Sequence, residues 1–499
     1  MTIGHDPIVA HPRSRWLDPV LVGLLALVIG IAGSWVPSYW SGEATTLQVA
    51  RLPLTDIWGF LGRRDLVDTV YDLGMHFWIT VGGEGEFWVR LPSALSAGIG
   101  AAGVLVLVRM LTSRRTAVAT GIVFAVLPRV TWAAVEARPS ALTAAIAVWL
   151  TVLVITASRS GRRVWWIAYG ALLGASVVTF VGLALLVVVH GLFLAWAPAP
   201  RRRRRASRRL MGWAVASAAG LAASSPAVIL ESRQRGELDW LTGTGAVTWW
   251  TVLFEPWFET SLVSAALAVG LLIALGTRLA DRSRTPATVV LLGAVWVIAP
   301  TVLLLVADLV AGPVYLARYL TFASPGLALL LGAACIGWRR RWIGTVLVVA
   351  VVLASVPTIV TQRLPDAKGG GSDLRPVAAQ IAGHAHPGDA FVLGNAGTIS
   401  SRPRQAFAAY PGRFAGLDDV ALEESATELG TFTDETYSVT DTTGFRVLDA
   451  RLKGHHRLWL ATLADDPLTS AETRAYARLG FHVRSTMAFT RTVVSLLER

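Results

Sequence analysis

The chain of 499 residues has little charge and almost no cysteine. Only 16% of its residues are charged and 54% are hydrophobic, whereas soluble domains have roughly 25% charged residues. This composition excludes an ordinary soluble enzyme, a disordered chain and a fibrous protein. The one cysteine, Cys335, lies in an apolar run, so the sequence offers neither an intrachain disulfide framework nor a cysteine-based metal site.

The hydrophobic residues come in long blocks. Many blocks reach about 20 residues, the length that an α-helix needs to cross the ~30 Å hydrocarbon core of a membrane. We therefore predict an α-helical polytopic membrane protein with about eleven transmembrane helices. The first block follows Arg13 and Arg15 and is too long for the hydrophobic region of a signal peptide, so we expect it to be retained. The expected positions are 17–36, 90–110, 116–134, 139–157, 164–179, 181–197, 210–230, 258–276, 286–307, 319–337 and 342–360.

Arginine predicts the orientation of these helices. All but two of the 45 basic residues are arginine, the exceptions being Lys368 and Lys453. The arginines gather in alternate loops, above all in the run 201–205, while the opposite loops carry most of the acidic residues. Because basic loops stay in the cytoplasm, the N-terminus is predicted to be cytoplasmic, and the odd number of spans places the C-terminal segment outside. We therefore attribute the net charge of +12 to orientation of the helices and to contact with anionic membrane lipid, and we expect no nucleic acid as partner.

The composition changes after the last apolar block. We predict a transmembrane catalytic domain at 1–362, a Gly-rich linker at 363–372 and an extracytoplasmic α/β domain at 373–499. In this domain we expect helices at 375–385 and 470–479 and strands at 390–393, 457–462, 482–484 and 488–495. It lacks a G-x-G-x-x-G fingerprint, a P-loop and a nucleophile elbow, so the sequence assigns no chemistry to it.

The first outer loop, 37–89, is too long for a simple connection. Glu43 lies where the chain leaves the membrane, next to Gly42 and other small residues. Partial desolvation raises the pKa of a carboxylate toward working pH, which suits a general base; the alternative is a solvated loop acid. Further along, 67–81 has apolar and aromatic residues at helical spacing, which is typical of a helix in the membrane interface or of a re-entrant segment.

Three short arginine-containing stretches at span ends face the predicted outer side, against the orientation bias. Arg90 opens the second span, Arg138 follows Glu136 in a tight outer turn, and Arg318 with Tyr319 opens the tenth span. The planar guanidinium group binds phosphate in a bidentate manner. These arginines are therefore candidates for phosphate binding, with anchoring to lipid headgroups as the alternative.

Together, these outer stretches resemble motifs of polytopic glycosyltransferases of the GT-C fold. The likeness is to glycosyltransferase family 39 and its bacterial relatives, which include the protein mannosyltransferases and the aminoarabinose–lipid A transferases. It covers residues of about 15–340 and rests on the order and shared outer side of the motifs. The matching stretches are 41–45 for an Asp-Glu-Ala motif, 65–78 for an Asp…Tyr-Tyr…Met-His-x-Trp motif, 90–95, 136–139 and, more weakly, 318–319.

The resemblance implies a membrane enzyme that uses a polyprenyl-phosphate-linked sugar donor, and a glycolipid, glycan or protein acceptor. Glu43 would be the general base, and Arg90, Arg138, Arg318 and Tyr319 would bind the donor phosphate. Residues that would bind or orient the acceptor, or hold an optional divalent cation, are Asp65, Asp68, His76 and Glu136.

The sequence departs from the family pattern in three places. Gly42 stands where an aspartate is usual, Asp72 replaces the second tyrosine of the pair, and Asp68–Thr69 replace a Pro-Pro pair. Because Gly42 supplies no carboxylate, Glu43 must act as the single carboxylate at this position. The preference for donor or acceptor is expected to differ from that of better-known family members.

The predicted reaction is sugar transfer with inversion at the anomeric carbon. A departing phosphate is an anion, so one base plus positive charge suffices, whereas glycoside hydrolysis needs two carboxyl groups. Mannose is the expected sugar because family members commonly use it. Alternatives are arabinofuranosyl transfer on the same fold, a lipid or glycan transporter, and a non-catalytic envelope-assembly protein.

Overall fold

The computed structural model describes residues 14–61, 69–197, 203–233, 247–280, 286–466 and 469–499. The chain divides into two compact units. Unit 1 contains the N-terminal residues as far as Ala32 together with Arg90–Ile359, and unit 2 contains Gly33–Val89 together with Val360–Arg499. The stretch predicted as the first outer loop and the C-terminal segment, which are far apart in the sequence, therefore belong to the same unit.

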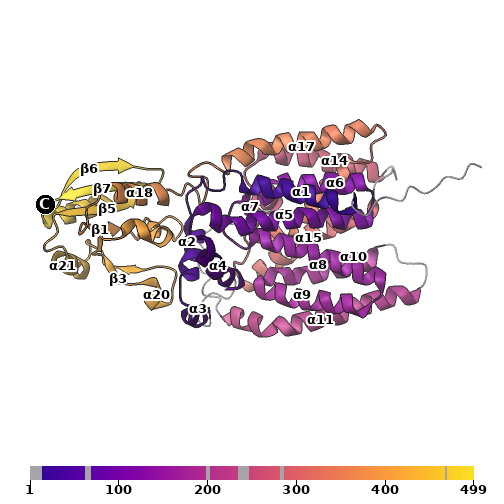
Figure 1. Cartoon of the computed structure of the whole chain (residues 1–499), viewed down its shortest axis with the longest axis horizontal. Helices are drawn as coiled ribbons and strands as arrows, with labels where there is room; N and C mark the ends of the chain where they lie inside the picture. Colours follow the sequence, from indigo (N-terminus) through magenta and orange to yellow (C-terminus); the bar gives the residue numbers. More distant parts are fainter. Residues whose placement is uncertain (1–13, 62–68, 198–202, 234–246, 281–285, 467–468) are drawn as a thin grey trace, which may run out of the picture. The chain divides into compact units, whose positions relative to one another are not determined.

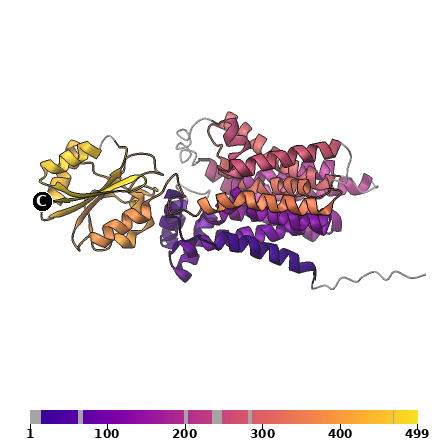
Figure 2. The same ribbon diagram turned by 90° about the horizontal axis from the view of Figure 1, so that it is seen from above.

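Unit 1 is helical, and its long helices run in roughly one direction (Figures 1 and 2). The elements are α1 (Ser14–Ile31), α5 (Glu86–Leu111), α6 (Arg114–Val126), α7 (Pro128–Ala134), α8 (Ser140–Ser160), α9 (Arg163–Thr179), η1 (Val181–Leu185), α10 (Leu186–Trp196), α11 (Arg203–Arg233), α12 (Trp249–Leu253), α13 (Glu255–Phe258), α14 (Leu262–Ala280), α15 (Ala287–Ala311), η3 (Ala317–Ala323), α16 (Ser324–Cys335) and α17 (Arg341–Thr361).

The apolar blocks of the sequence form these helices. Each predicted block coincides with a helix or a pair of consecutive helices, and the division expected near Thr179 is present because α9 ends there. Among the described residues, seven helices are long and apolar enough to cross a membrane, or eight if α6 and α7 form one span. Trp16–Ile31 and Val181–Trp196 are shorter apolar helices. This is a multi-pass α-helical membrane protein.

The predicted single span at 116–134 is wrong in one respect, because α6 and α7 meet at an angle of 60°. Leu127 lies between them with extended backbone angles (φ −60°, ψ 127°). A residue before proline avoids the helical region because the proline ring crowds its backbone, and Pro128 then starts a new helix at its first position.

Glycines let several helices of unit 1 approach closely. A Cβ atom added at Gly220 of α11 would lie 2.6 Å from the carbonyl oxygen of Gly170 in α9, and one added at Gly293 of α15 would lie 2.8 Å from that of Gly326 in α16. Small residues at helix crossings are the usual means of close packing in membranes. These pairs fix which helices are neighbours inside the bundle.

In unit 2, the stretch predicted as the first outer loop forms three helices, α2 (Ser41–Ala50), α3 (Leu54–Leu61) and α4 (Thr69–Gly82). The interfacial helix predicted at 67–81 corresponds to α4, apart from residues 67 and 68, which lie outside the described residues. Trp78 of α4 stacks on Trp88 at a centroid distance of 4.5 Å, and each indole N–H donates to the other residue's carbonyl oxygen. This mutual pair ties α4 to the chain that follows it.

The C-terminal part of unit 2 has an α/β fold with a five-stranded sheet of order β2-β1-β5-β7-β6. β1 is parallel to β2 and β5, whereas β7 is antiparallel to β5 and β6; β3 and β4 form a separate antiparallel pair. The strands are β1 (Ala390–Leu393), β2 (Asp418–Asp419), β3 (Leu422–Glu424), β4 (Glu435–Thr436), β5 (Arg457–Leu463), β6 (His482–Ala488) and β7 (Thr492–Glu498), and the helices are α18 (Leu374–His384), α19 (Gln405–Ala409), η4 (Pro411–Phe414), α20 (Ala426–Leu429), α21 (Thr442–Arg451) and α22 (Thr469–Arg478).

Helices cover both faces of this sheet (Figure 2). Alternation along β1 explains the two layers: Ala390 and Val392 join a core with α21 and α22, while Phe391 packs on Phe407 and Phe414 on the other face. The helices and strands expected in this region all correspond to observed elements, but α19, α21 and the short strands were not foreseen.

The stretch predicted as a Gly-rich linker, 363–372, folds into consecutive turns. Gly369, Gly370 and Gly371 have φ values of +56°, +69° and +97°, which explains the run of glycines. Lys368 and Ser372 at its two ends are buried. Glycine thus serves turn geometry here.

Candidate functional site

Glu43 lies in the first turn of α2, and its side chain is fully buried. α2 packs against α4 and α19 of the same unit, and Thr46 and Leu47 on α2 are equally inaccessible. The N-terminal turn is the end of a helix where the dipole favours a carboxylate. The burial excludes the alternative of a solvated loop acid.

Trp40 explains why residue 42 is a glycine. A Cβ atom added at Gly42 would lie 2.5 Å from the Cη2 and Cζ2 atoms of the Trp40 ring. A Cβ atom added at Gly369, where φ is +56°, would lie 2.7 Å from the Trp40 Cβ atom. Trp40 thus lies close to both glycines, and its ring covers the position next to Glu43, where the family pattern has a second carboxylate.

His76 is held at the opposite end of α2 from Glu43. Its Nδ1 atom lies 2.8 Å from the carbonyl oxygen of Ala50, the last residue of α2. Ala50 is seven residues beyond Glu43, which corresponds to a rise of about 10 Å along a helix. Asp72 on α4 is buried as well. Asp65 and Asp68 lie outside the described residues.

In unit 1, the start of α5 adjoins the turn between α7 and α8. The Ser93 hydroxyl donates to the carbonyl oxygen of Arg138 at 3.3 Å, and the Arg138 N–H donates to the carbonyl oxygen of Glu136 at 2.9 Å. Arg90, one turn before Ser93, is fully buried; Glu136 is also buried and Arg138 is half-buried. Two of the predicted motifs, 90–95 and 136–139, therefore meet in space.

The third arginine motif lies on η3, which packs against both α7 and α8. The Arg318 guanidinium group lies 6.0 Å from the centroid of the Tyr319 ring, and that ring contacts Phe180 at a centroid distance of 5.8 Å. The helices on either side of the Arg138 turn are thus neighbours of the element that carries Arg318. Within unit 1, the elements of the predicted phosphate-binding residues form one group.

A buried ion pair in the same region was not foreseen. Arg129 on α7 lies 2.7 Å from a carboxylate oxygen of Glu259 and donates to the carbonyl oxygens of Glu255 and Pro256. Among the described residues, Glu259 is the only non-glycine residue with positive φ, at +53°. The sequence signal was an arginine inside an apolar block, because ionisable residues within spans are rare and usually functional.

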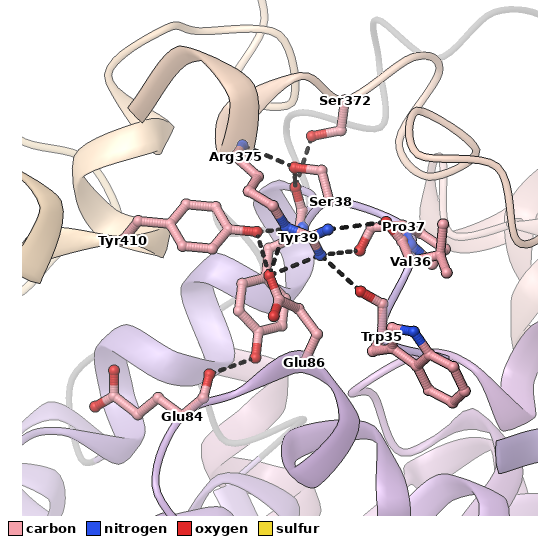
Figure 3. A network of polar contacts seen from close by, with 10 residues as sticks. All are labelled: Trp35, Val36, Pro37, Ser38, Tyr39, Glu84, Glu86, Ser372, Arg375 and Tyr410. Carbon is pink, nitrogen blue, oxygen red and sulfur yellow. Dashed lines mark hydrogen bonds and ion pairs between the residues drawn. The ribbon is translucent and has the colours of Figure 1, made fainter. Parts of the chain in front are cut away.

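Sequence reasoning also missed a polar cluster in unit 2 (Figure 3). Arg375 and Tyr410 of the C-terminal segment both contact the Glu86 carboxylate, at 2.7 and 2.9 Å. Burial, followed by the charge of Glu86, raises the pKa of Tyr410 to about 12, so its hydroxyl keeps its proton at ordinary pH. Neither here nor anywhere else among the described residues is a group of three or more His, Cys, Asp or Glu side chains placed to hold a metal ion.

Known proteins share this architecture. Residues 70–230 match the family described as dolichyl-phosphate-mannose-protein mannosyltransferase. The solved structure of ArnT from Cupriavidus metallidurans bound to undecaprenyl phosphate is similar with a TM-score of 0.57 and 16% identity, covering 96% of this chain and 97% of that one. The apo oligosaccharyltransferase of Archaeoglobus fulgidus is similar with a TM-score of 0.52 and 9% identity, covering 94% of this chain and 71% of that one.

A comparison with curated proteins gave no match. The structural likeness extends over nearly the whole chain and includes both units, whereas the family match covers the part from α4 to α11. The structural likeness shows that the chain is a membrane protein with the GT-C fold, and residues 70–230 resemble the protein mannosyltransferases.

Proposed function

We propose that this chain is a membrane glycosyltransferase that moves a sugar from a polyprenyl-phosphate donor to an acceptor of the cell envelope. The observation that carries the proposal is the likeness along nearly the whole chain to a structure that holds undecaprenyl phosphate. The description of the matching family favours mannose as the sugar. In this proposal the N-terminus is cytoplasmic and the C-terminal α/β domain extracytoplasmic, as the arginine distribution predicts.

Glu43 is the proposed general base. Its carboxylate takes the proton of the acceptor hydroxyl, the acceptor oxygen forms a bond to the anomeric carbon, and the bond from that carbon to the phosphate oxygen breaks. The configuration inverts, and polyprenyl phosphate leaves as an anion. The full burial of Glu43 supports this role, because a base in a site closed to bulk water activates the acceptor hydroxyl and not a water molecule that would hydrolyse the donor.

Arg90, Arg138, Arg318 and Tyr319 are the proposed phosphate-binding residues. Support comes from their grouping in unit 1, where the start of α5, the α7–α8 turn and η3 are neighbours. Fixed positive charge near the leaving oxygen stabilises the charge that develops as the glycosidic bond breaks. Glu136 and His76 keep their proposed role toward the acceptor, as do Asp65 and Asp68.

A transfer assay tests the proposal. The purified chain in nanodiscs is given radiolabelled polyprenyl-phosphate mannose and, separately, the arabinose donor, with a crude envelope fraction as acceptor. We expect label transfer from one donor and a loss of roughly 10²–10⁴-fold in Glu43→Gln, the usual contribution of a general base.

The matched control is Glu424→Gln, an exposed acid of the same unit, which should transfer as well as the wild type. Transfer from the arabinose donor alone would replace mannose with arabinofuranose. Full activity in Glu43→Gln would remove Glu43 from the mechanism. Donor binding without transfer would point to a different acceptor or sugar, whereas no binding of either donor would favour a transporter or an assembly protein.

A further inference from the structure

The chain segment that leads into α2 is held by one arginine of the C-terminal segment (Figure 3). The Arg375 guanidinium group donates to the carbonyl oxygens of three consecutive residues, Trp35, Val36 and Pro37, at 3.0, 3.0 and 2.9 Å. Its Nε atom donates to Glu86 at 2.8 Å. One side chain thus fixes the backbone path that precedes the helix of Glu43, and only arginine has enough donors in a rigid fork to do so.

Backbone hydrogen bonds continue this attachment up to the first turn of α2. The Arg375 N–H donates to the Ser38 hydroxyl at 3.0 Å, and the Ser372 hydroxyl donates to the Tyr39 carbonyl oxygen at 2.6 Å. The Tyr39 N–H donates to the Tyr410 hydroxyl at 3.0 Å, and this hydroxyl donates in turn to Glu86. Four residues before Glu43, both backbone polar groups of Tyr39 are therefore bound by the C-terminal segment.

The other end of α2 is held by the same segment. Arg51, directly after α2, donates to both carboxylate oxygens of Glu84 at 3.0 and 2.8 Å. It also donates to the carbonyl oxygens of Ala408 and Ala409, the last two residues of α19. Terminal carbonyl groups of a helix lack intrahelical partners and carry negative partial charge, so a guanidinium group is well suited to bind them.

We infer that the C-terminal segment positions Glu43, with Arg375 and Tyr410 as positioning residues that act through the backbone of residues 35–40. The inference rests on the proposed function for its kinetic consequence, but its structural part, that these residues hold α2 in place, can be measured without any transfer. The sequence assigned no chemistry to the C-terminal domain. In this inference its sheet supports α18 and α19, and the residues on and next to these helices bind both ends of α2.

The test compares Tyr410→Phe with the wild type as full-length protein in nanodiscs. This variant keeps the ring and removes only the hydroxyl that joins Tyr39 to Glu86. We expect faster amide hydrogen exchange in residues 41–50 and a decrease in kcat of roughly ten- to a hundredfold, because a displacement of about 1 Å can cost ~10²-fold. The KM for the donor should not change.

Tyr437→Phe is the matched control. Tyr437 lies in the same domain, where its ring contacts Arg451, and no hydrogen bond of its hydroxyl belongs to the cluster around Glu86. This variant should leave both exchange and kcat at wild-type values. Should Tyr410→Phe fold poorly, Ser372→Ala removes the bond to the Tyr39 carbonyl oxygen and is expected to have the same effects.

The outcomes separate this inference from the proposed function. Faster exchange in α2 together with lower kcat supports both. Faster exchange in α2 with no transfer by the wild type supports the positioning of α2 and overturns the proposed function. Unchanged exchange in residues 41–50 overturns the positioning role, whether or not the wild type transfers sugar.

Discussion

Replacement of Gly42 by alanine tests how the residue next to Glu43 is enclosed. The added Cβ atom would lie 2.5 Å from two atoms of the Trp40 ring and 3.0 Å from a third, far inside van der Waals contact. Gly369 also lies close to Trp40, because a Cβ atom added there would come within 2.7 Å of the Trp40 Cβ atom. The methyl group must therefore displace the indole or the first turn of α2.

The expected cost follows from two opposing effects. Inserting a methyl group into a well-packed site costs about 1–3 kcal/mol. Replacing a helical glycine by alanine returns at most about 1 kcal/mol through helix propensity. With the full return subtracted, Gly42→Ala should therefore destabilise the protein by up to about 2 kcal/mol.

Gly74 on α4 is the matched control, because it is a helical glycine of the same unit with nothing within 4 Å of an added Cβ atom. Gly74→Ala is expected to raise the melting temperature, and Gly42→Ala to lower it, with faster hydrogen exchange in residues 41–50. A second substitution, Trp40→Leu, should recover part of the loss in Gly42→Ala, since contacting residues are not additive. Equal melting temperatures for Gly42→Ala and Gly74→Ala would show that the indole does not occupy this position.

Two further predictions concern other parts of the chain. Burial, with help from Asp466, raises the pKa of Glu472 from 4.5 to about 7, so between these pH values the folded state holds a proton that the unfolded chain releases. Stability therefore falls as pH rises from about 4.5 to about 7, and Glu472→Gln should stabilise the protein more at pH 8 than at pH 5, by about 1–2 kcal/mol after solvent screening. Melting temperatures at the two pH values check this, and equal increments at both would contradict it. In unit 1, a Cβ atom at Gly332 would lie 2.1 Å from the Thr120 Oγ1 atom and 2.8 Å from the Thr120 Cα atom. In thermal unfolding, Gly332→Ala should therefore lose about 1–3 kcal/mol of stability. Gly276→Ala is the control and should lose none, because a Cβ atom at Gly276 meets open space.

The helices were predictable because their signal is local. Apolar blocks of about 20 residues and the arginines between them require no knowledge of distant contacts. Pro128 is a local signal for the bend at Leu127, because proline restricts the residue before it, but the prediction used hydropathy alone and gave a single span. The strands β1 and β5 were found because a parallel strand buried on both faces is a short continuous apolar run.

The polar contacts of the site were not predictable, because they join residues far apart in the chain. Arg375 and Trp35 are 340 positions apart, and neither residue differs in kind from many others in the sequence. The same holds for Arg129 and Glu259, whose pairing depends on the packing of α7 against α13. The burial of Glu43 depends on α4 and α19 as well as on its own helix.

These contacts also change how the arginine content is to be understood. Orientation in the membrane needs only positive charge, and lysine would serve that purpose equally well. Arg375 instead binds three carbonyl oxygens and a carboxylate, and Arg404 joins Asp419 to Asp434 at 2.6 and 2.7 Å while nearly buried. Lysine has a single nitrogen and cannot reach acceptors that are spread over several residues. From the sequence, the positive charge was assigned to orientation in the membrane. Some of these arginines instead hold together segments that are far apart in the chain, and Arg375→Lys would keep the charge but lose this function.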